Sequence, residues 1–186
     1  MLRYVPIRSV LAAFLLTIGA GVAAAQEYKA RATGFFELGA LNNETGAILS
    51  NGTGKLTLDV DQNSATYSLT YSGLSANVTQ AHLHFAKVHV PGGIYAFLCT
   101  NLGNGPAGTP PCPAAGGTVT GTITSASILA VPTQNITAGD FGALRAALGS
   151  NTTYVNIHTV KFPAGEIRGQ VQLSNDDEDE GRGHDR

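Results

Sequence analysis

The sequence predicts an all-β fold, a Greek-key β-sandwich or barrel with one short helix. Its apolar residues recur mainly at every second position, which is the spacing of a strand with one buried face. Short strand-like runs are separated by turn-forming Gly, Pro, Asn and Asp. Only one segment has helical spacing. Short strands with Gly-rich turns and a single helix are typical of a sandwich or barrel.

The strands are expected in order along the chain. Residues 52–61 place Leu56, Leu58 and Val60 on one face, and residues 65–74 continue the alternation after a Gln-Asn-Ser turn, so the two predict a hairpin. Further strands are expected at 92–99, 116–128, 154–160 and 165–173, the last two joined by a turn containing Pro163 and Gly165.

The one expected helix covers residues 137–148. Phe141, Leu144 and Leu148 lie at helical spacing, and Gly149 follows as a stop signal. No internal repeat interrupts the pattern, so residues 26–175 are expected to form a single domain.

Residues 1–25 have the features of a signal peptide. Arg3 and Arg8 precede an apolar run at 10–18, and three alanines at 23–25 fit a signal-peptidase site. The alternative is an uncleaved anchor, but the run is shorter than the roughly 20 residues that span a bilayer. We expect cleavage near residue 25, a periplasmic or secreted protein, and no membrane span in the mature chain.

Charge divides the mature chain into two parts. Residues 26–175 carry seven basic and seven acidic side chains, and this neutral body gives no electrostatic reason to bind nucleic acid. Residues 176–186 carry six acidic and two basic side chains and nothing apolar to bury, which predicts a disordered acidic tail. The tail suits solubility; loose cation binding that includes His184 is the alternative.

Cys99 and Cys112 are expected to form a disulfide. Gly, Pro, Thr and Asn dominate the loop between them, and a disulfide is the default in an exported protein. A thiolate metal site is the alternative, but the two residues lack the short spacing usual for such sites.

His82 and His84 alternate with apolar residues. On a strand, Ala81, Leu83 and Phe85 face one side and the two imidazoles face the other. The same parity on residues 154–159 sets Asn156 and His158 opposite the apolar face.

The last two strands predict a hairpin that places Asn156 and His158 near Glu166 and Arg168. If the strand containing His82 and His84 lies beside it, three neutral imidazoles converge, with Asn156, Glu166 and Arg168 around them. Such a set suits copper, ahead of zinc, and leaves a coordination position open. The alternative is an ordinary solvated strand face. His89 is expected to be a solvated loop residue and not a ligand.

Several motifs together resemble the CHRD domain, named after the chordin repeats. They are Gly-Thr-Gly-Lys-Leu-Thr-Leu, Ala-His-Leu-His, Tyr-Val-Asn-Ile-His-Thr and Gly-Glu-Ile-Arg-Gly-Gln-Val, in this order over roughly residues 31–173. The resemblance implies an all-β extracellular module without an established enzymatic activity. It also implies a His-x-His and Asn-x-His-Thr pattern at His82, His84 and His158. Many members continue His-x-His with Gly-Pro, whereas this chain has Phe85 and Ala86.

Two functions are compatible with these features. One is a copper-binding domain, similar by analogy to the copper half of copper–zinc superoxide dismutases, in which Arg168 would attract a small anion. The other is a non-catalytic interaction or structural module for an extracytoplasmic protein partner, with the histidines as part of a polar core. No nucleophile–base set or phosphate-binding loop indicates a hydrolase or a nucleotide-binding protein.

Overall fold

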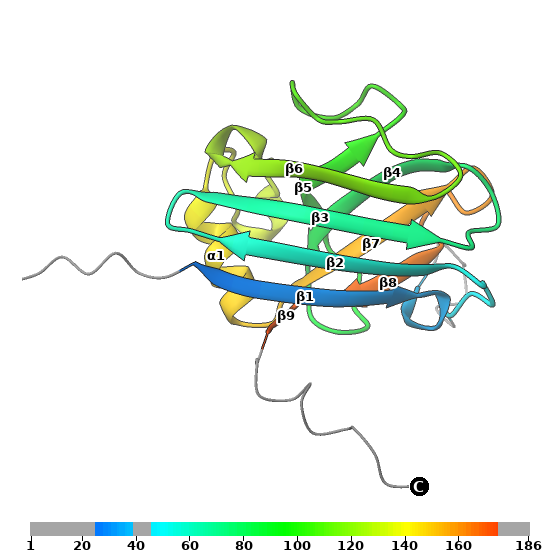
Figure 1. Ribbon diagram of the computed structural model, residues 1–186. Helices are drawn as coiled ribbons and strands as arrows, with labels where there is room; N and C mark the ends of the chain where they lie inside the picture. The colour runs from blue at the N-terminus through cyan, green and yellow to red at the C-terminus, as the bar shows by residue number, and fades with distance from the viewer. Residues whose placement is uncertain (1–24, 39–45, 175–186) are drawn as a thin grey trace, which may run out of the picture.

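The computed structural model of this 186-residue chain describes residues 25–38 and 46–174. They form an all-β, nearly closed antiparallel barrel with one short α-helix at one end (Figure 1). The expected signal peptide, apart from its last residue, and the acidic tail lie outside the described residues. The elements are β1 (Gln26–Thr33), η1 (Gly34–Phe36), β2 (Thr53–Val60), β3 (Ser64–Ser72), β4 (Val78–Phe85), β5 (Gly93–Thr100), β6 (Gly117–Thr124), η2 (Ser125–Ser127), η3 (Pro132–Gln134), α1 (Phe141–Gly149), β7 (Thr153–Thr159), β8 (Ile167–Gln170) and β9 (Gln172–Leu173).

The strands are ordered β5-β4-β7-β8-β1-β2-β3-β6, and β9 pairs with β1. β3 and β6 are neighbours although β4 and β5 separate them in the chain, which is the connection expected of a Greek key. The segment after η2 helps to close the barrel, because Ile128 bridges Ala96 of β5 and the Leu129 amide donates to the Tyr95 carbonyl at 2.9 Å.

The hairpin predicted for residues 52–74 is present as β2 and β3. Leu56 pairs with Leu69 and Leu58 with Tyr67, and all four side chains are buried. Alternate residues of the other strands complete a continuous apolar core. Its largest fully buried aliphatic side chains are Leu56, Leu58, Leu69, Leu83, Leu98, Ile123, Leu144, Leu148, Ile157 and Ile167.

The helix is shorter at its start than its sequence pattern predicts. Gly139 adopts φ +84°, which is outside the helical region, and the Asp140 side chain accepts a hydrogen bond from the Ala143 amide at 2.8 Å. Asp140 is therefore the N-cap, and α1 begins at Phe141. Its buried residues are Phe141, Leu144, Ala147 and Leu148, so the predicted apolar face is correct.

The bounds of two expected strands also differ, and the structure has one strand that the sequence pattern does not predict. The strand expected at 116–128 ends at Thr124, where η2 begins. The last expected strand divides at Val171, whose amide bonds to the Thr153 carbonyl, while Gln172 pairs with Lys29. β1 was not identified from the sequence, because its buried face, Tyr28, Ala30 and Ala32, contains two alanines that give a weak apolar signal.

Cys99 and Cys112 form the predicted disulfide, with their Cα atoms 5.0 Å apart. The side chain of Asn101 reinforces this loop by hydrogen bonds to Cys112 and Val78. The disulfide indicates an oxidising compartment. Within residues 25–38 and 46–174, no helix has the length and apolarity needed to cross a membrane.

Candidate metal centre

Strands β4 and β7 are adjacent and antiparallel, and they position the three candidate histidines. His82 pairs with Asn156, and His84 pairs with Tyr154. Ala81, Leu83, Val155 and Ile157 of the same strands belong to the apolar core. The predicted alternation is therefore present, but the histidine face is not solvated: His82 is 0 % exposed, His84 7 % and His158 6 %.

The three rings form one cluster. The His82 ring centroid lies 4.9 Å from that of His158 and 5.5 Å from that of His84. One ring nitrogen from each residue can be chosen so that all three lie within 4.8 Å of one another. The structure thus brings together the three residues that sequence parity places on one face.

Backbone carbonyls orient two of the rings. Nδ1 of His84 lies 3.0 Å from the Gly92 carbonyl oxygen, and Nδ1 of His158 lies 3.0 Å from that of Pro163. A carbonyl only accepts, so both Nδ1 atoms carry the proton and both Nε2 atoms keep a lone pair. This is the tautomer that a metal-binding imidazole adopts when its other nitrogen donates to a carbonyl.

Hydrogen bonding within the cluster is incomplete. Nδ1 of His82 lies 3.2 Å from Nε2 of His158, but the Nε2 atoms of His82 and His84 are buried without any partner. A buried polar atom that lacks a hydrogen bond costs about 1–3 kcal/mol. Two such atoms lie in this cluster, and its three histidines are close enough together that they could hold a metal ion.

The cluster is electrically neutral near pH 7. Burial, together with the neighbouring His158 and His84, lowers the pKa of His82 to about 2. Burial lowers the pKa of His84 to about 4 against the opposing effect of its bond to Gly92. Burial also lowers the pKa of His158, while the bond to Pro163 and the charge of Glu37 act in the opposite direction. Neutral imidazole is the form that binds metal ions.

Aromatic side chains surround the cluster. Phe97 contacts His82 edge to face at 4.4 Å between centroids, and Tyr154 stacks on His84 at 4.7 Å with 6° between the planes. The Arg168 guanidinium carbon lies 3.4 Å from the centre of the Tyr154 ring. These contacts hold the imidazoles in place and exclude water.

A model of the CHRD domain matches residues 28–171. The chain belongs to the CHRD-domain family. The matched range covers every described strand except β9 and the first two residues of β1, and it includes the three histidines. Neither a curated protein nor a solved structure matches the chain.

In this CHRD domain, Arg168 and Asn156 lie in the β7–β8 part of the sheet, paired directly with each other in register. Arg168 is 3 % exposed, and it donates to the carbonyls of Lys87 at 3.3 Å and Val90 at 2.9 Å. Arg168 thereby fixes the loop that follows β4, and that loop also carries the carbonyl of Gly92.

Glu37 is a buried acidic residue that the sequence pattern did not reveal. It lies just after η1, is 4 % exposed, and accepts a hydrogen bond from the Asn156 side-chain amide. Its charge also acts on His158 and Arg168. The only sequence signal was an isolated acid after two phenylalanines, which does not distinguish this buried carboxylate from a surface one.

Glu166 belongs to a different polar cluster of the CHRD domain. Its carboxylate accepts hydrogen bonds from the Ser50 hydroxyl at 2.6 Å, the Thr159 hydroxyl at 2.7 Å and the Ser75 amide at 2.8 Å. None of its hydrogen bonds in the described part of the chain goes to a histidine. Glu166 precedes β8, and its amide donates to the Ile157 carbonyl. The alternation of side chains between the two faces of β8 therefore does not apply to Glu166.

His89 lies outside the cluster, in the loop between β4 and β5. It is exposed, has a positive φ of +59°, and stacks on Phe36 at 6.2 Å between centroids. The ligand-forming group contains only His82, His84 and His158 among the described residues.

Proposed function

We propose that this CHRD-domain protein is exported and binds a metal ion, copper in preference to zinc, through His82, His84 and His158. The observation that supports the proposal most strongly is the pair of buried, unpartnered Nε2 atoms on His82 and His84. Each has a lone pair available, or gains one by a change of tautomer, and coordination would satisfy it. Family membership and the disulfide support an oxidising compartment.

The size of the cluster fits a single ion. Nitrogens about 2.0–2.1 Å from one ion lie about 3.4 Å apart in tetrahedral geometry. The observed limit of 4.8 Å for the three nitrogens therefore requires ring movements of about an ångström. Rotations about side-chain bonds are enough for such movements.

Imidazole ligands suit both copper and zinc, and the general affinity order favours copper. Three neutral imidazoles without a nearby thiolate or ligating carboxylate would leave the ion cationic. Glu37, which acts electrostatically on His158, would supply the compensating negative charge.

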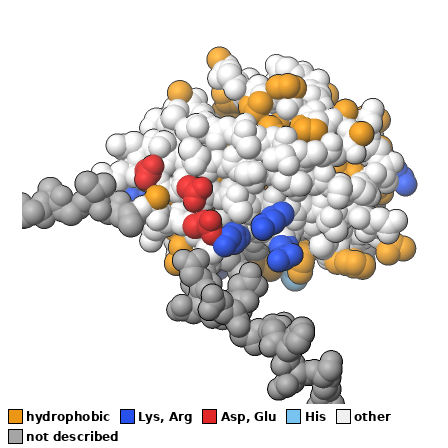
Figure 2. All heavy atoms as spheres, viewed as in Figure 1, with side chains coloured by type: hydrophobic (Ala, Val, Ile, Leu, Met, Phe, Trp, Pro, Cys, Tyr) orange, Lys and Arg blue, Asp and Glu red, His pale blue; other side chains and the backbone are white. Residues whose placement is uncertain are grey.

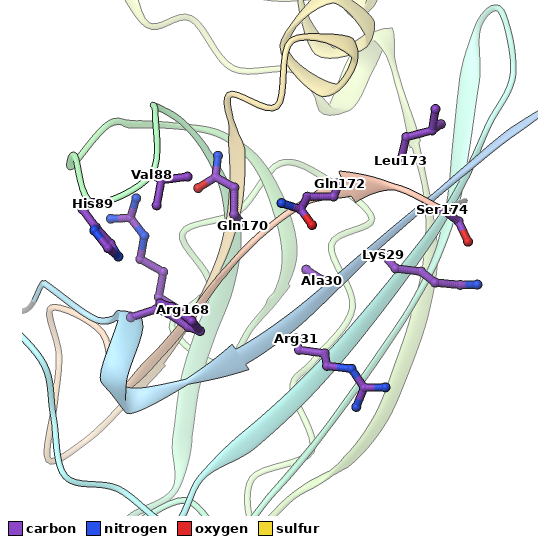
Figure 3. A pocket seen from close by; sticks show the side chains of 11 residues that line it. Lys29, Ala30, Arg31, Val88, His89, Arg168, Gln170, Gln172, Leu173 and Ser174 are labelled. Atoms are coloured by element: carbon purple, nitrogen blue, oxygen red, sulfur yellow. The ribbon is translucent and has the colours of Figure 1, made fainter. Parts of the chain in front are cut away.

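Burial favours holding the ion over rapid turnover of a substrate. None of the three histidines lines the groove shown in Figure 3 or the pocket beside Phe97. Arg168 is occupied by two backbone carbonyls and by Tyr154. Activity resembling that of a superoxide dismutase would therefore need an opening beside the cluster, and we place it second to metal binding.

The competing function is a non-catalytic interaction module in which the histidines are a polar part of the core. The hydrogen bonds of His84 and His158 to backbone carbonyls favour it, since they stabilise the fold without a metal. A competition titration of untagged, oxidised protein with Cu(I) and Zn(II) distinguishes the two functions. Metal binding predicts one copper site of higher affinity than the zinc site; the interaction module predicts no specific site.

A further inference from the structure

A pocket of about 290 Å³ lies at the seam between β5 and β6, the two ends of the strand order. Residues 120–122 of β6 form one side of it, residues 106–110 form another, and Tyr67 and Phe97 add aromatic surface. None of the described residues that line the pocket is acidic or basic. Figure 2 likewise shows the charged side chains of this view gathered away from β6, mostly near β1 and β2. The pocket therefore suits an uncharged ligand.

The loop that forms one wall of the pocket is held in place. The disulfide closes this loop, and the Thr100 amide donates to the Pro110 carbonyl at 3.0 Å. Within the loop, the Thr109 hydroxyl donates to the Pro106 carbonyl at 2.8 Å. A preformed wall of this kind loses little conformational freedom when a ligand binds, which favours affinity.

The outer edge of β6 supplies free hydrogen-bonding groups to the pocket. The Thr124 amide donates to the Ser127 hydroxyl, and Ser64, opposite Thr124 on β3, bonds towards β2. Backbone groups of successive strand residues point to opposite sides, so those of Thr120 and Thr122 also point away from β3. Among the described residues, neither forms a hydrogen bond outside the β3–β6 ladder, and both side chains are exposed. Each therefore offers an amide, a carbonyl and a hydroxyl.

The shape of the pocket favours a compact ligand over an extended peptide, which is the usual partner of a free strand edge. At one end, Ser127 already occupies the Thr124 amide. Beside Gly121, the Tyr67 hydroxyl donates to the Leu98 carbonyl of β5 at 2.5 Å, which ties β3 to β5 across the seam. The volume is also at the lower end of the roughly 300–1,000 Å³ usual for ligand pockets. One ring fits this space better than a strand.

We propose that this pocket binds one neutral sugar unit of a glycan. The hydroxyls of a sugar donate and accept, as do the backbone and side-chain groups of Thr120 and Thr122. The apolar C–H groups of the ring pack on aromatic surface, which Phe97 and Tyr67 provide. A carboxylate in the same place would lose hydration without gaining a cationic partner. This function goes beyond metal binding and does not depend on it.

A titration of the metal-free, isotope-labelled full-length protein, followed by amide NMR spectra, tests the proposal. The probes are the methyl glycosides of glucose, galactose and N-acetylglucosamine. At least one should give saturable shifts at the amides of Thr120, Gly121, Thr122 and Gly108, with a roughly millimolar dissociation constant expected for so small a ligand. Methyl glucuronide, which differs from the glucoside by its carboxylate, should bind more weakly.

A matched pair of variants tests the contact with β6. Thr122→Val removes one hydroxyl and keeps a β-branched side chain at an exposed strand position, so the domain should fold normally. It should weaken glycoside binding about two- to tenfold, because a hydrogen bond is lost. Thr66→Val is the control, since Thr66 is exposed directly opposite Thr122 on β3 but does not line the pocket. It should bind as the wild type does.

The proposal is overturned if none of the three glycosides shifts these amides, if the glucuronide binds as well as the glucoside, or if the two variants behave alike. A neutral peptide of alternating valine and threonine that shifts them when the glycosides do not would assign the edge to strand pairing instead. Because the protein contains no metal in this experiment, either result leaves the proposed copper site to be judged by its own titration.

Discussion

Nδ1 of His82 lies 3.2 Å from Nε2 of His158, although the residues are 76 positions apart in the chain. Nδ1 of His158 donates to the Pro163 carbonyl, so Nε2 of His158 has no proton. Nε2 of His158 therefore accepts a hydrogen bond from Nδ1–H of His82. This hydrogen bond holds two of the rings together without metal. It also leaves Nε2 of His82 with a lone pair and no partner in the described part of the chain.

Replacing one ligand should remove specific copper binding. His158→Ala or His82→Ala leaves two imidazoles, and we expect copper affinity to fall by at least about 100-fold because a ligand is lost. Competition titration with a Cu(I) chelator measures the effect. His89→Ala is the matched control, since His89 lies in an exposed loop and should bind copper as the wild type does. Retained affinity in both ligand variants would place the metal elsewhere.

Acid should destabilise the metal-free protein before carboxylates protonate. The pKa values of His82 and His84 are about 2 and 4 in the folded chain, below the value of about 6.5 expected when unfolded. The unfolded state therefore binds more protons below pH 6.5, and stability falls as pH falls. From pH 7 to 5.5 we expect a loss of about 1 kcal/mol for each of these two histidines, with His158 adding to it. Denaturant unfolding at the two pH values measures the loss, and unchanged stability would contradict the burial of neutral rings.

Adding a methyl group at Gly165 should disturb the polar surroundings of the cluster. Gly165 has φ +131°, and a Cβ there would lie 2.5 Å from Oε2 of Glu37 and 2.6 Å from Oδ1 of Asn156. We expect Gly165→Ala to destabilise the protein by about 1–3 kcal/mol through the broken hydrogen bond and backbone strain. Gly108→Ala is the control, because Gly108 has φ +86° but no atom within 4 Å of the added Cβ. Equal destabilisation in thermal melts would show that the strain alone accounts for the effect.

Glu166 should contribute to stability and not to metal binding. Burial would raise its pKa, but hydrogen bonds from Ser50, Thr159 and Ser75 outweigh burial and lower it. Its contribution is therefore present above about pH 4.5 and is lost as pH falls below that value. Glu166→Gln should cost about 1–3 kcal/mol in denaturant unfolding, because an amide nitrogen cannot accept these bonds. Copper affinity should remain unchanged. A large loss of copper affinity in this variant would show that Glu166 does contribute to the metal site.

Much of the site could be predicted from strand parity. The alternation of Ala81, His82, Leu83 and His84 predicts which side chains share a face. The pairing of β4 with β7 then places the histidines of the two strands side by side on that face. Parity does not predict burial of the polar face. That burial depends on Phe97 and on loops whose positions follow from tertiary packing.

The residues that sequence analysis assigned differently lie where regular strand geometry ends. Glu166 precedes β8, so the alternation of faces along β8 does not apply to it. Glu37 follows a 3-10 turn, which no periodic pattern predicts. β1 gives only a weak sequence signal, because two of its buried residues are alanines, which contrast little with polar neighbours. The disulfide was predictable because export and loop composition both favour it.

The most direct test of metal binding is elemental analysis of untagged protein purified from its native compartment. The account predicts about one copper per chain, removed by a Cu(I) chelator and absent from His158→Ala prepared in the same way. Correctly oxidised wild-type protein that carries no metal, and binds none when copper is added, would contradict it and favour the interaction module.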